Sequence, residues 1–538
     1  MQQQLSLKLL PAEALNNDAI KQRVADSAGL EMTDITGFHL LKKSIDARGK
    51  QPWINLTVRA FINEPFADNS SETIHFNDVR KASRKVIIIG AGPAGLFAAI
   101  KLMEQGIQPI ILERGKDVRA RRRDLALLNK EGIVNPESNY CFGEGGAGTY
   151  SDGKLYTRSN KRGDINRILN LFVQFGAEEQ ILYEAHPHIG TNKLPQIMTA
   201  MRQAIVEHGG LFLFEKKLVD FVVTNNRVTK VKTADGDEYE ADDVILATGH
   251  SARDIFTLLH SKNILIEAKP FALGVRIEHP QNVIDSIQYN HSSLANETRP
   301  DGLPPASYSL VQQVEGNGVF SFCMCPGGII APAATSPGQL VVNGWSPSKR
   351  NNPFANSGMV VTCDRGSIEN LEEYKAFLQT KNATIDSPLS MMYFQEMVEA
   401  NAYNAGGGKF VAPAQRMVDF CNNKMSATLP GCSYVPGLRS SDLRVVLPSF
   451  IHQSLQQAFK SFGKKMRGYF TNDALIVATE SRTSSPVRIP RDSHTLQHPQ
   501  IENLYPCGEG AGYAGGIVSA AMDGERVADM IGRVGIKM

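Results

Sequence analysis

Three glycines and one carboxylate in the sequence have the types and spacing of a dinucleotide-binding site. Gly90, Gly92 and Gly95 follow an apolar, β-branched run with GxGxxG spacing, and that run is long enough for one buried parallel strand. The first glycine permits a tight turn, the second lets the backbone approach a pyrophosphate, and the third lets a helix pack closely on the strand. Glu113 ends a second apolar run 18 residues after Gly95. A carboxylate at that point binds both hydroxyls of an adenosine ribose and repels a 2′-phosphate.

The residues between these groups predict the helix that positions them. Pro93 suits a first helical turn because its missing N–H has no acceptor there, and Gly106 is a suitable helix end. An apolar face runs through Leu96, Ala99, Ile100 and Met103. Strand, glycines, helix, second strand and terminal acid together satisfy the context that a lone GxGxxG lacks. We therefore assign cofactor binding to Gly90, Ala91, Gly92, Pro93, Ala94, Gly95, Glu113 and Arg114.

A second glycine-rich segment spans residues 143–154 and follows no apolar strand, so it is not a second dinucleotide fingerprint. Such a segment offers several backbone N–H groups and lets a flat ring approach the chain, while a flexible surface loop is the alternative. The side chains of Ser151 and Lys154 add hydrogen-bond donors. The cofactor-binding residues predicted here are Gly145, Gly146, Ala147, Gly148, Ser151 and Lys154.

Later apolar runs return the chain to the same predicted sheet. We expect strands at residues 86–89, 110–113, 211–214 and 244–247 to share one parallel sheet, with residues 503–506 returning near it. The last of these runs precedes a Gly-Glu-Gly and a small-residue helix whose N-terminus is able to face a pyrophosphate. These segments add Ala247, Thr248, Gly249, Gly508, Glu509, Gly510, Gly515, Gly516 and Ile517 to the predicted cofactor site, and the run of short strands at residues 217–239 adds Val219.

The sequence divides into three units of the α/β class. Residues 1–80 show a βαββ pattern typical of a small α+β module, and the polar residues 63–84 read as a linker. Residues 85–268 and 472–538 form the two parts of a Rossmann-like, three-layer nucleotide-binding domain. Residues 269–471, rich in Pro and Gly, form an α+β substrate-side domain inserted between them.

Composition restricts the partners and the compartment. The 538 residues carry 57 Lys and Arg against 55 Asp and Glu, a net charge of +2, which predicts no general affinity for nucleic acid or membranes. The first residues lack the blocks of a signal peptide, and no apolar run reaches the length of a membrane span. Seven scattered cysteines indicate neither a disulfide framework nor a metal site. We expect a cytoplasmic protein with a small-molecule substrate.

The nucleotide-binding segments, together with Ala247-Thr-Gly249 and Gly508-Glu-Gly, resemble the two-dinucleotide-binding-domain flavoproteins related to glutathione reductase and fumarate reductase. More specific segments are similar to an uncharacterised bacterial family of FAD-dependent dehydrogenases, and that similarity spans nearly the whole chain. They are Phe142-Gly-Glu-Gly-Gly-Ala-Gly, Gly249-His-Ser-Ala-Arg-Asp254, the segment 270–280, Phe322-Cys-Met-Cys-Pro-Gly-Gly328 and the segment 482–488. The resemblance implies FAD as cofactor and transfer of hydride or electrons through the flavin.

One departure concerns the electron donor. Relatives of glutathione reductase carry a second GxGxxG domain for NAD(P)H, and the sequence has none between Gly249 and Asp473. Gly406-Gly-Gly408 follows a helical pattern rather than a strand. The architecture therefore resembles the fumarate-reductase and geranylgeranyl-reductase branch, and NAD(P)H, if used, is a transient donor.

The substrate-side residues leave alternatives open. Candidates for contacting an anionic substrate or moving a proton are His250, Arg276 and Arg482, with Arg253 and His279 beside them, and structural salt bridges or capping are the alternative for each. Residues 480–488 read as a wall of the flavin-side pocket or as a polar structural turn. Cys323 and Cys325 are a redox pair or ordinary packing residues. The basic run from Lys116 to Arg123 contacts phosphate or forms a solvated helix face.

Three functions compete at this point. The leading one is an FAD-dependent oxidoreductase acting on a small molecule. A binding or regulatory protein without turnover is the second, because Rab escort and dissociation-inhibitor proteins use this fold for binding alone; the retained glycines and Glu113 argue against it. A tRNA-modifying flavoenzyme is the third, and the near-zero net charge gives it little support.

Overall fold

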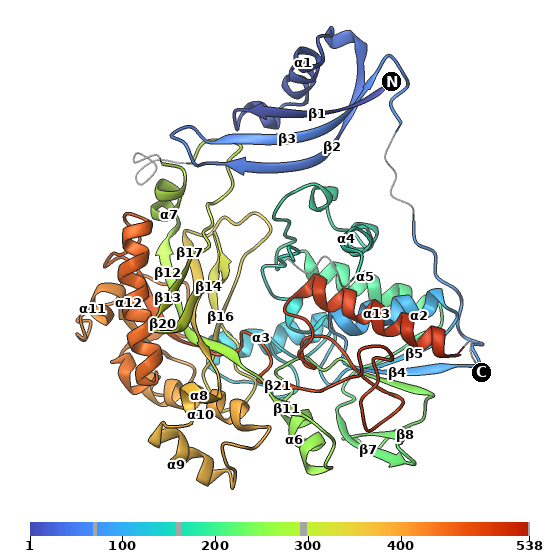
Figure 1. Cartoon of the computed structure of the whole chain (residues 1–538), viewed down its shortest axis with the longest axis vertical. Helices are drawn as coiled ribbons and strands as arrows, with labels where there is room; N and C mark the ends of the chain where they lie inside the picture. The colour runs from blue at the N-terminus through green and yellow to red at the C-terminus, as the bar shows by residue number, and fades with distance from the viewer. Residues whose placement is uncertain (68–72, 158–162, 291–298, 536–538) are drawn as a thin grey trace.

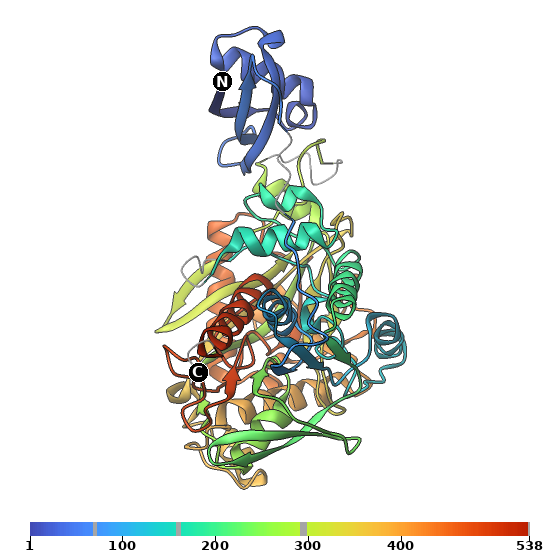
Figure 2. The same cartoon turned by 90° about the vertical axis from the view of Figure 1, so that its right-hand side faces the viewer.

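The computed structural model describes residues 1–67, 73–157, 163–290 and 299–535. Figures 1 and 2 show a small N-terminal module standing at one end of a larger body. The body consists of a parallel-sheet domain and a second domain built on a large mixed sheet. Residues 68–72 of the predicted linker and the last three residues of the chain lie outside the described residues.

The N-terminal module is the predicted βαββ unit. Its antiparallel sheet has the order β1 (Gln2–Leu9), β3 (Trp53–Ile62), β2 (Ile35–Asp46), and α1 (Asn17–Ala28) packs against it. The alternation in β3 is the reason for this packing, because Ile54, Leu56 and Val58 are all buried in one core with Ile20 and Val24 of α1.

The parallel sheet contains every strand that the sequence predicts for it. Its order is β22 (Leu504–Pro506), β10 (Asp243–Leu246), β4 (Lys85–Ile89), β5 (Gln108–Leu112), β6 (Leu211–Leu213), and all its neighbouring pairs are parallel. Right-handed crossovers place the carboxyl ends of such strands at one edge, where ligands of these sheets bind.

Alternate residues of β4 face two different layers. Val86 and Ile88 belong to the core formed with α2 (Pro93–Glu104), α5 (Leu194–Glu207) and α13 (Ile517–Gly535). Ile87 and Ile89 belong to the core on the other face, formed with α6 (Arg253–Ser261) and a small sheet. That small sheet consists of β7 (Leu218–Thr224), β8 (Arg227–Thr233) and β9 (Glu238–Tyr239). The predicted three-layer architecture is confirmed.

Two glycines allow these helices to pack closely. A Cβ on Gly95 would lie 2.1 Å from the carbonyl oxygen of Gly90, and a Cβ on Gly524 would lie 2.1 Å from the carbonyl oxygen of Ala94. Gly95 therefore lets α2 approach the turn after β4, as the motif predicts, and Gly524 lets α13 approach α2.

The second domain is organised by a seven-stranded mixed sheet. Its order is β13 (Val311–Val314), β14 (Asn317–Cys325), β17 (Phe354–Cys363), β12 (Phe271–Pro280), β20 (Leu475–Glu480), β18 (Ala412–Arg416), β19 (Leu438–Ser440). The long helix α12 (Ser449–Lys465) packs against this sheet. The other helices are α7 (Gln281–Gln288), α8 (Arg365–Ile368), α9 (Glu372–Thr380), α10 (Ser390–Gly406) and α11 (Met417–Cys421).

Shorter elements complete the body. Two helices of the nucleotide-binding part are α3 (Val118–Glu131) and α4 (Ile165–Gln174). Two strand pairs are β11 (Glu267–Ala268) with β21 (Val487–Arg488), and β15 (Ile329–Pro332) with β16 (Val342–Trp345).

The return to the nucleotide-binding domain comes later than predicted. The sequence predicts it at residue 472, but β20 pairs with β12 and β18 of the mixed sheet and leaves it only after Glu480. An apolar run such as Leu475–Glu480 suits either sheet, so its partner strands alone decide the boundary.

Candidate active site

A cavity lies at the carboxyl ends of β4, β5 and β10 and brings together most of the predicted cofactor residues. Those that line it are Gly90, Gly92, Pro93, Ala94, Glu113, Arg114, Gly146, Ala147, Gly148, Ser151, Lys154, Ala247, Thr248, Gly249, Glu509, Gly515, Gly516 and Ile517. His250 and Arg482 also line it. Segments that are far apart in the sequence therefore meet around one space.

The remaining predicted residues do not line this cavity. They are Ala91, Gly95, Gly145, Val219, Gly508, Gly510 and the catalytic candidate Arg276. Val219 is 42% exposed on β7, whereas its neighbour Leu218 lines the cavity, because successive side chains of a strand point to opposite faces. Gly508 and Gly510 support the site by close approach: an added Cβ would lie 2.9 Å from Ala94 Cβ and 2.6 Å from the Gly249 carbonyl oxygen, respectively.

Backbone N–H groups hold the Glu113 carboxylate in place at the cavity. Ala91 N–H donates to Oε2 at 2.9 Å, while the N–H groups of Gly115 and Gly143 donate to Oε1 at 2.8 and 2.9 Å. A carboxylate has about four acceptor sites, so these three bonds leave acceptor capacity for a hydroxyl group. The carboxylate thus ties the first glycine turn to the second glycine-rich segment and suits a ribose.

The glycine turn leaves room for a ligand. Gly90 has φ of +103°, which favours glycine, and a Cβ there would lie 2.5 Å from the Ala247 carbonyl oxygen. A Cβ on Gly92 would meet no atom nearer than Gly146 Cα, at 4.0 Å. The N-termini of α2 and α13 both reach the cavity and present unpaired backbone N–H groups together with positive dipole ends. These residues fit the pyrophosphate and ribose of a dinucleotide.

Arg121 has a role that neither interpretation of the basic run anticipates. Its guanidinium is fully buried and donates to the carbonyl oxygens of Asn139, Tyr140, Glu144 and Gly146 at 2.8–3.0 Å. It therefore shapes the second glycine-rich segment from within. The neighbouring Arg119, Arg122 and Arg123 are exposed on α3.

His250 and Glu509 lie together at one wall, with His250 Nε2 3.9 Å from Glu509 Oε1. Burial, with the cations Arg482 and Arg253 nearby, lowers the pKa of His250 to about 3, so its imidazole is neutral at pH 7. Burial raises the pKa of Glu509 to about 7, although Lys269 opposes this shift. Glu509 is thus able to gain or lose a proton beside the cavity near neutral pH.

Replacing Glu509 with glutamine is expected to change how stability depends on pH. The folded-state pKa of Glu509 lies above the unfolded value, so ionising this group opposes folding increasingly as pH rises from about 4.5 to about 7. Relative to the wild type, the E509Q protein should gain on the order of 2 kcal/mol between pH 5 and pH 8. Urea unfolding of the two apoproteins across this range measures the difference. A constant difference would contradict the assignment.

Arg482 is anchored by Glu399 rather than free in the cavity. The Glu399 carboxylate accepts hydrogen bonds from Arg253 at 2.8 and 2.9 Å, from Arg482 at 3.2 Å, and from the Ser481 hydroxyl at 2.6 Å. Burial alone would raise the pKa of Glu399, but the two guanidinium groups bring it down to about 2. Arg482 therefore holds a fixed positive charge at the cavity, whereas Arg253 forms a structural salt bridge with Glu399.

Arg276 does not line the cavity and has a structural role. It is fully buried, pairs with Glu480 at 2.5 Å, and donates to Asn356 Oδ1 at 2.8 Å and to the Cys323 carbonyl oxygen at 2.6 Å. It therefore holds the end of β14, which carries the two cysteines. His279 is equally buried, with Nε2 2.8 Å from the Tyr469 carbonyl oxygen, and does not line the cavity.

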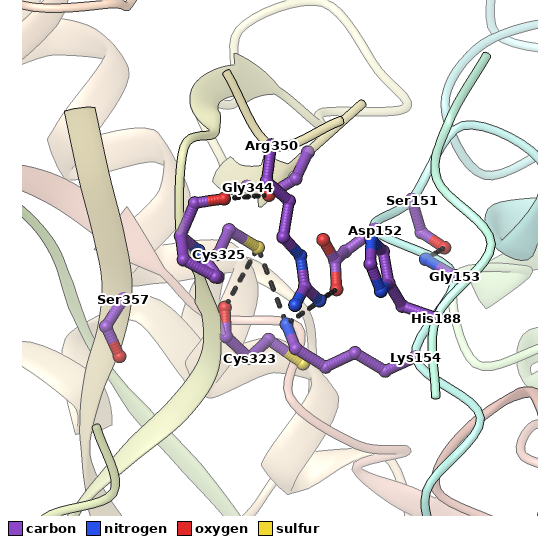
Figure 3. A network of polar contacts seen from close by, with 12 residues as sticks. Ser151, Asp152, Gly153, Lys154, His188, Cys323, Cys325, Gly344, Arg350 and Ser357 are labelled. Atoms are coloured by element: carbon purple, nitrogen blue, oxygen red, sulfur yellow. Dashed lines mark hydrogen bonds and ion pairs between the residues drawn. The ribbon is translucent and has the colours of Figure 1, made fainter. Parts of the chain in front are cut away.

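Figure 3 shows Lys154 reaching from the second glycine-rich segment toward Cys325. Lys154 Nζ lies 3.6 Å from Cys325 Sγ and 3.4 Å from Asp152 Oδ2, and that same oxygen lies 2.9 Å from Arg350 Nη2. Burial opposes ionisation of Asp152, but the two cations lower its pKa to about 2. The substrate-side wall thus carries a fixed ion network.

The two cysteines of this wall differ in their surroundings. Cys325 is buried, whereas Cys323 is exposed toward the cavity and adopts φ of +44° at the end of β14. Loss of hydration inside the cavity raises the pKa of the Cys323 thiol to about 11, against the effect of Lys154. The Cys325 thiol is 3.2 Å from the Cys323 carbonyl oxygen.

Two members of the ion network have no signal in the sequence. Asp152 lies within the glycine-rich segment, where nothing local indicates a charged partner, and Arg350 belongs to no motif. Arg350 is 198 residues from Asp152, so only the folded chain reveals the pair.

Family models match all three units of the chain. Residues 84–258 match the pyridine nucleotide-disulphide oxidoreductase model, and residues 270–483 match the model described as FAD-dependent protein, C-terminal domain-like. Residues 1–61 match a domain of unknown function. Fold, site and family models together define an FAD-dependent oxidoreductase, and FAD is its cofactor.

The chain belongs to the family of an uncharacterised protein from Clostridium beijerinckii. The two sequences are 36% identical over 532 residues, which cover 96% of each chain. This resemblance includes the N-terminal module as well as the flavoprotein body.

Solved flavoprotein structures share a distant likeness with this chain. The 2,6-dihydroxypyridine-3-hydroxylase of Arthrobacter nicotinovorans is 11% identical, covers 84% of both chains and has a TM-score of 0.37. The glycine oxidase of Bacillus cereus is 13% identical, covers 84% of this chain and 96% of its own, and has a TM-score of 0.30. At these scores the likeness does not bear on substrate or reaction.

Among the residues that the structure describes, none of the helices is both long and apolar enough to cross a bilayer.

Proposed function

We propose that the protein is a dehydrogenase or reductase that transfers hydride or electrons between FAD and a small-molecule substrate. The observation that carries this proposal is one continuous cavity whose walls come from both domains. Glu113 and the glycine turns form the nucleotide side, while Lys154, Cys323 and Arg482 lie on the substrate side. When bound, FAD supplies the redox chemistry; the protein binds and orients it and excludes water.

The charges on the substrate side favour an anionic substrate. Burial opposes the charge on Lys154, but the neighbouring Cys325 and Asp152 raise its pKa, so it remains a cation at the cavity. Arg482 is a second fixed cation there, and Glu509 is a group able to exchange a proton near neutral pH. The proposal therefore assigns Lys154 and Arg482 to holding the substrate and Glu509 to proton transfer.

The electron donor follows from a count of nucleotide sites. The sequence contains one complete strand–GxGxxG–helix–strand–acid unit, and FAD uses it. A nicotinamide cofactor therefore binds transiently in the same cavity as the substrate. The free cysteines suit a reducing cytoplasm, and we propose neither a nucleic-acid nor a membrane partner for this site.

We predict ping-pong kinetics for the complete reaction, because donor and acceptor exclude each other from one cavity. Anaerobic reduction of the bound flavin by NADH or NADPH, followed by its absorbance, first identifies a competent donor, and dithionite gives the non-enzymatic reference for full reduction. Double-reciprocal plots at several fixed acceptor concentrations should then be parallel. Intersecting lines, which require a ternary complex, would overturn the shared-cavity proposal, and a flavin that no donor reduces would overturn the enzymatic one.

A further inference from the structure

A second cleft, with a volume of about 1500 Å³, lies between the N-terminal module and the body. The end of β2 and the turn after it form one wall, while the ends of α7 and α12 form the other. Six Lys and Arg residues line it against one described carboxylate, that of Glu184. They are Lys43, Arg48, Lys50, Arg350, Lys465 and Arg467.

Four of these cations, Lys43, Lys50, Lys465 and Arg467, form no ion pair with a carboxylate among the described residues. Arg48 is paired with Asp46 through two contacts of 2.8 Å. Lys465 donates to a backbone carbonyl oxygen, that of Val311, while Lys50 and Arg467 are exposed. Because they come from opposite walls, Lys50 and Arg467 give the cleft an excess of positive charge that neither wall neutralises.

The inner end of the cleft holds a buried polar group without a partner. Arg350 has φ of +48°, and its side chain is 14% exposed. Its Nη2 is bonded to Asp152, but Nε has no hydrogen-bond partner, and neither has Asp152 Oδ1. Unpartnered buried donors are rare, so Nε is a donor able to bind an added acceptor, and a guanidinium binds oxyanions best. Asp152 itself lines the flavin cavity, which places Arg350 between the two spaces.

We propose that this cleft binds an extended, polyanionic small molecule bearing phosphate or carboxylate groups. Arg350 binds one oxyanion group at the inner end, and Lys50 and Arg467 attract the rest of the ligand at the mouth. The N-terminal module thereby acquires a function as one wall of a binding site. This site is separate from the proposed redox reaction and does not depend on it.

The lining of the cleft disfavours a nucleic acid. Tyr289 is the one Phe, Tyr or Trp among the described lining residues, and it is 4% exposed, with its hydroxyl bonded to the Pro304 carbonyl oxygen. Single-stranded nucleic acids need aromatic faces on which bases stack, in addition to cations. Among its described residues the cleft therefore offers charge without an exposed Phe, Tyr or Trp face.

Calorimetric titration of the FAD-loaded protein with tripolyphosphate and, separately, with citrate at low salt tests the proposal. One molecule of at least one probe should bind per chain, and the comparison identifies phosphate or carboxylate as the preferred group. Either K50E/R467E or R350Q should weaken binding about tenfold or more, because each removes attraction along the ligand. The matched control R119E/R123E makes the same charge change on exposed positions of α3 and should bind within about twofold of the wild type.

Flavin absorbance reports whether each variant keeps its cofactor, so loss of the redox site is distinguished from loss of this one. Lys50 and Arg467 are exposed, so we expect their replacement to leave the fold intact. Weaker binding by K50E/R467E would then be caused by the change of charge in the cleft. Unchanged binding in both cleft variants, or an equal loss in the α3 control, would overturn the proposal. Tighter binding of a uridine decamer, lost in the same variants, would overturn the assignment to a small molecule.

Discussion

Replacing Glu113 with alanine is expected to remove most of the FAD from the purified protein. The substitution deletes the acceptor that would bind the ribose and leaves the N–H groups of Ala91, Gly115 and Gly143 without their carboxylate. A buried donor that loses its partner costs about 1–3 kcal/mol, so the glycine turns that shape the cavity should loosen as well. We expect FAD retention to fall by about a hundredfold or more, measured by flavin absorbance relative to protein.

Two comparisons make this prediction specific. E113Q keeps an oxygen acceptor and should retain more FAD than E113A, while E240A, at an exposed glutamate beside Lys230, should retain all of it. The flavin released from the wild type on denaturation should be FAD, because an adenosine ribose is what Glu113 would bind. Full FAD retention in E113A, or release of FMN from the wild type, would contradict this role.

Replacing Arg276 with methionine is expected to give the largest loss of stability. Arg276 and Glu480 are 0% and 1% exposed and form an ion pair of 2.5 Å at the centre of the mixed sheet. Removing the guanidinium strands a buried carboxyl group whose Oε1 already lacks a hydrogen-bond partner. Breaking such a pair from one side costs about 3–5 kcal/mol, measured by urea denaturation.

The pH dependence and the double variant test the cause of this loss. Burial raises the pKa of Glu480, and Arg276 opposes that shift, so without Arg276 the folded protein favours the protonated carboxyl group. The destabilisation of R276M should therefore be smallest at low pH and grow as pH rises above the unfolded value of the carboxyl group. R276M/E480L should recover part of the stability, because no buried charge remains. A double variant as unstable as the sum of both single variants would show that shape, not charge, is responsible.

The sequence determined the nucleotide-binding unit because all its information is local. The strand, the three glycines, the helix and Glu113 occur within about thirty consecutive residues, and each has a conformational or packing reason to be there. Gly90 and Gly95 show this directly, since an added Cβ at either position would meet a backbone oxygen at 2.5 or 2.1 Å. Hydrophobic runs likewise predicted every strand of the parallel sheet.

The environment of the charged residues could not be predicted from the sequence, because it depends on partners far along the chain. Arg121 looks like one more cation of a solvated helix, but it is buried and donates to carbonyl oxygens of the second glycine-rich segment. Arg276 looks like a substrate contact, but it is paired with Glu480, 204 residues later. An isolated sequence position does not reveal whether a charge is solvated or paired.

Only the tertiary structure shows which residues lie together on the substrate side of the cavity. Lys154 was predicted as a cofactor ligand, and only the folded chain places it beside Cys325, with Asp152 linking it to Arg350. The same holds for β20, whose apolar run is compatible with either sheet until its neighbours are known. Local patterns fix which residues form strands, helices and turns; the packing of those elements decides which distant charges meet, because a buried charge is stable only where a partner from another element compensates it.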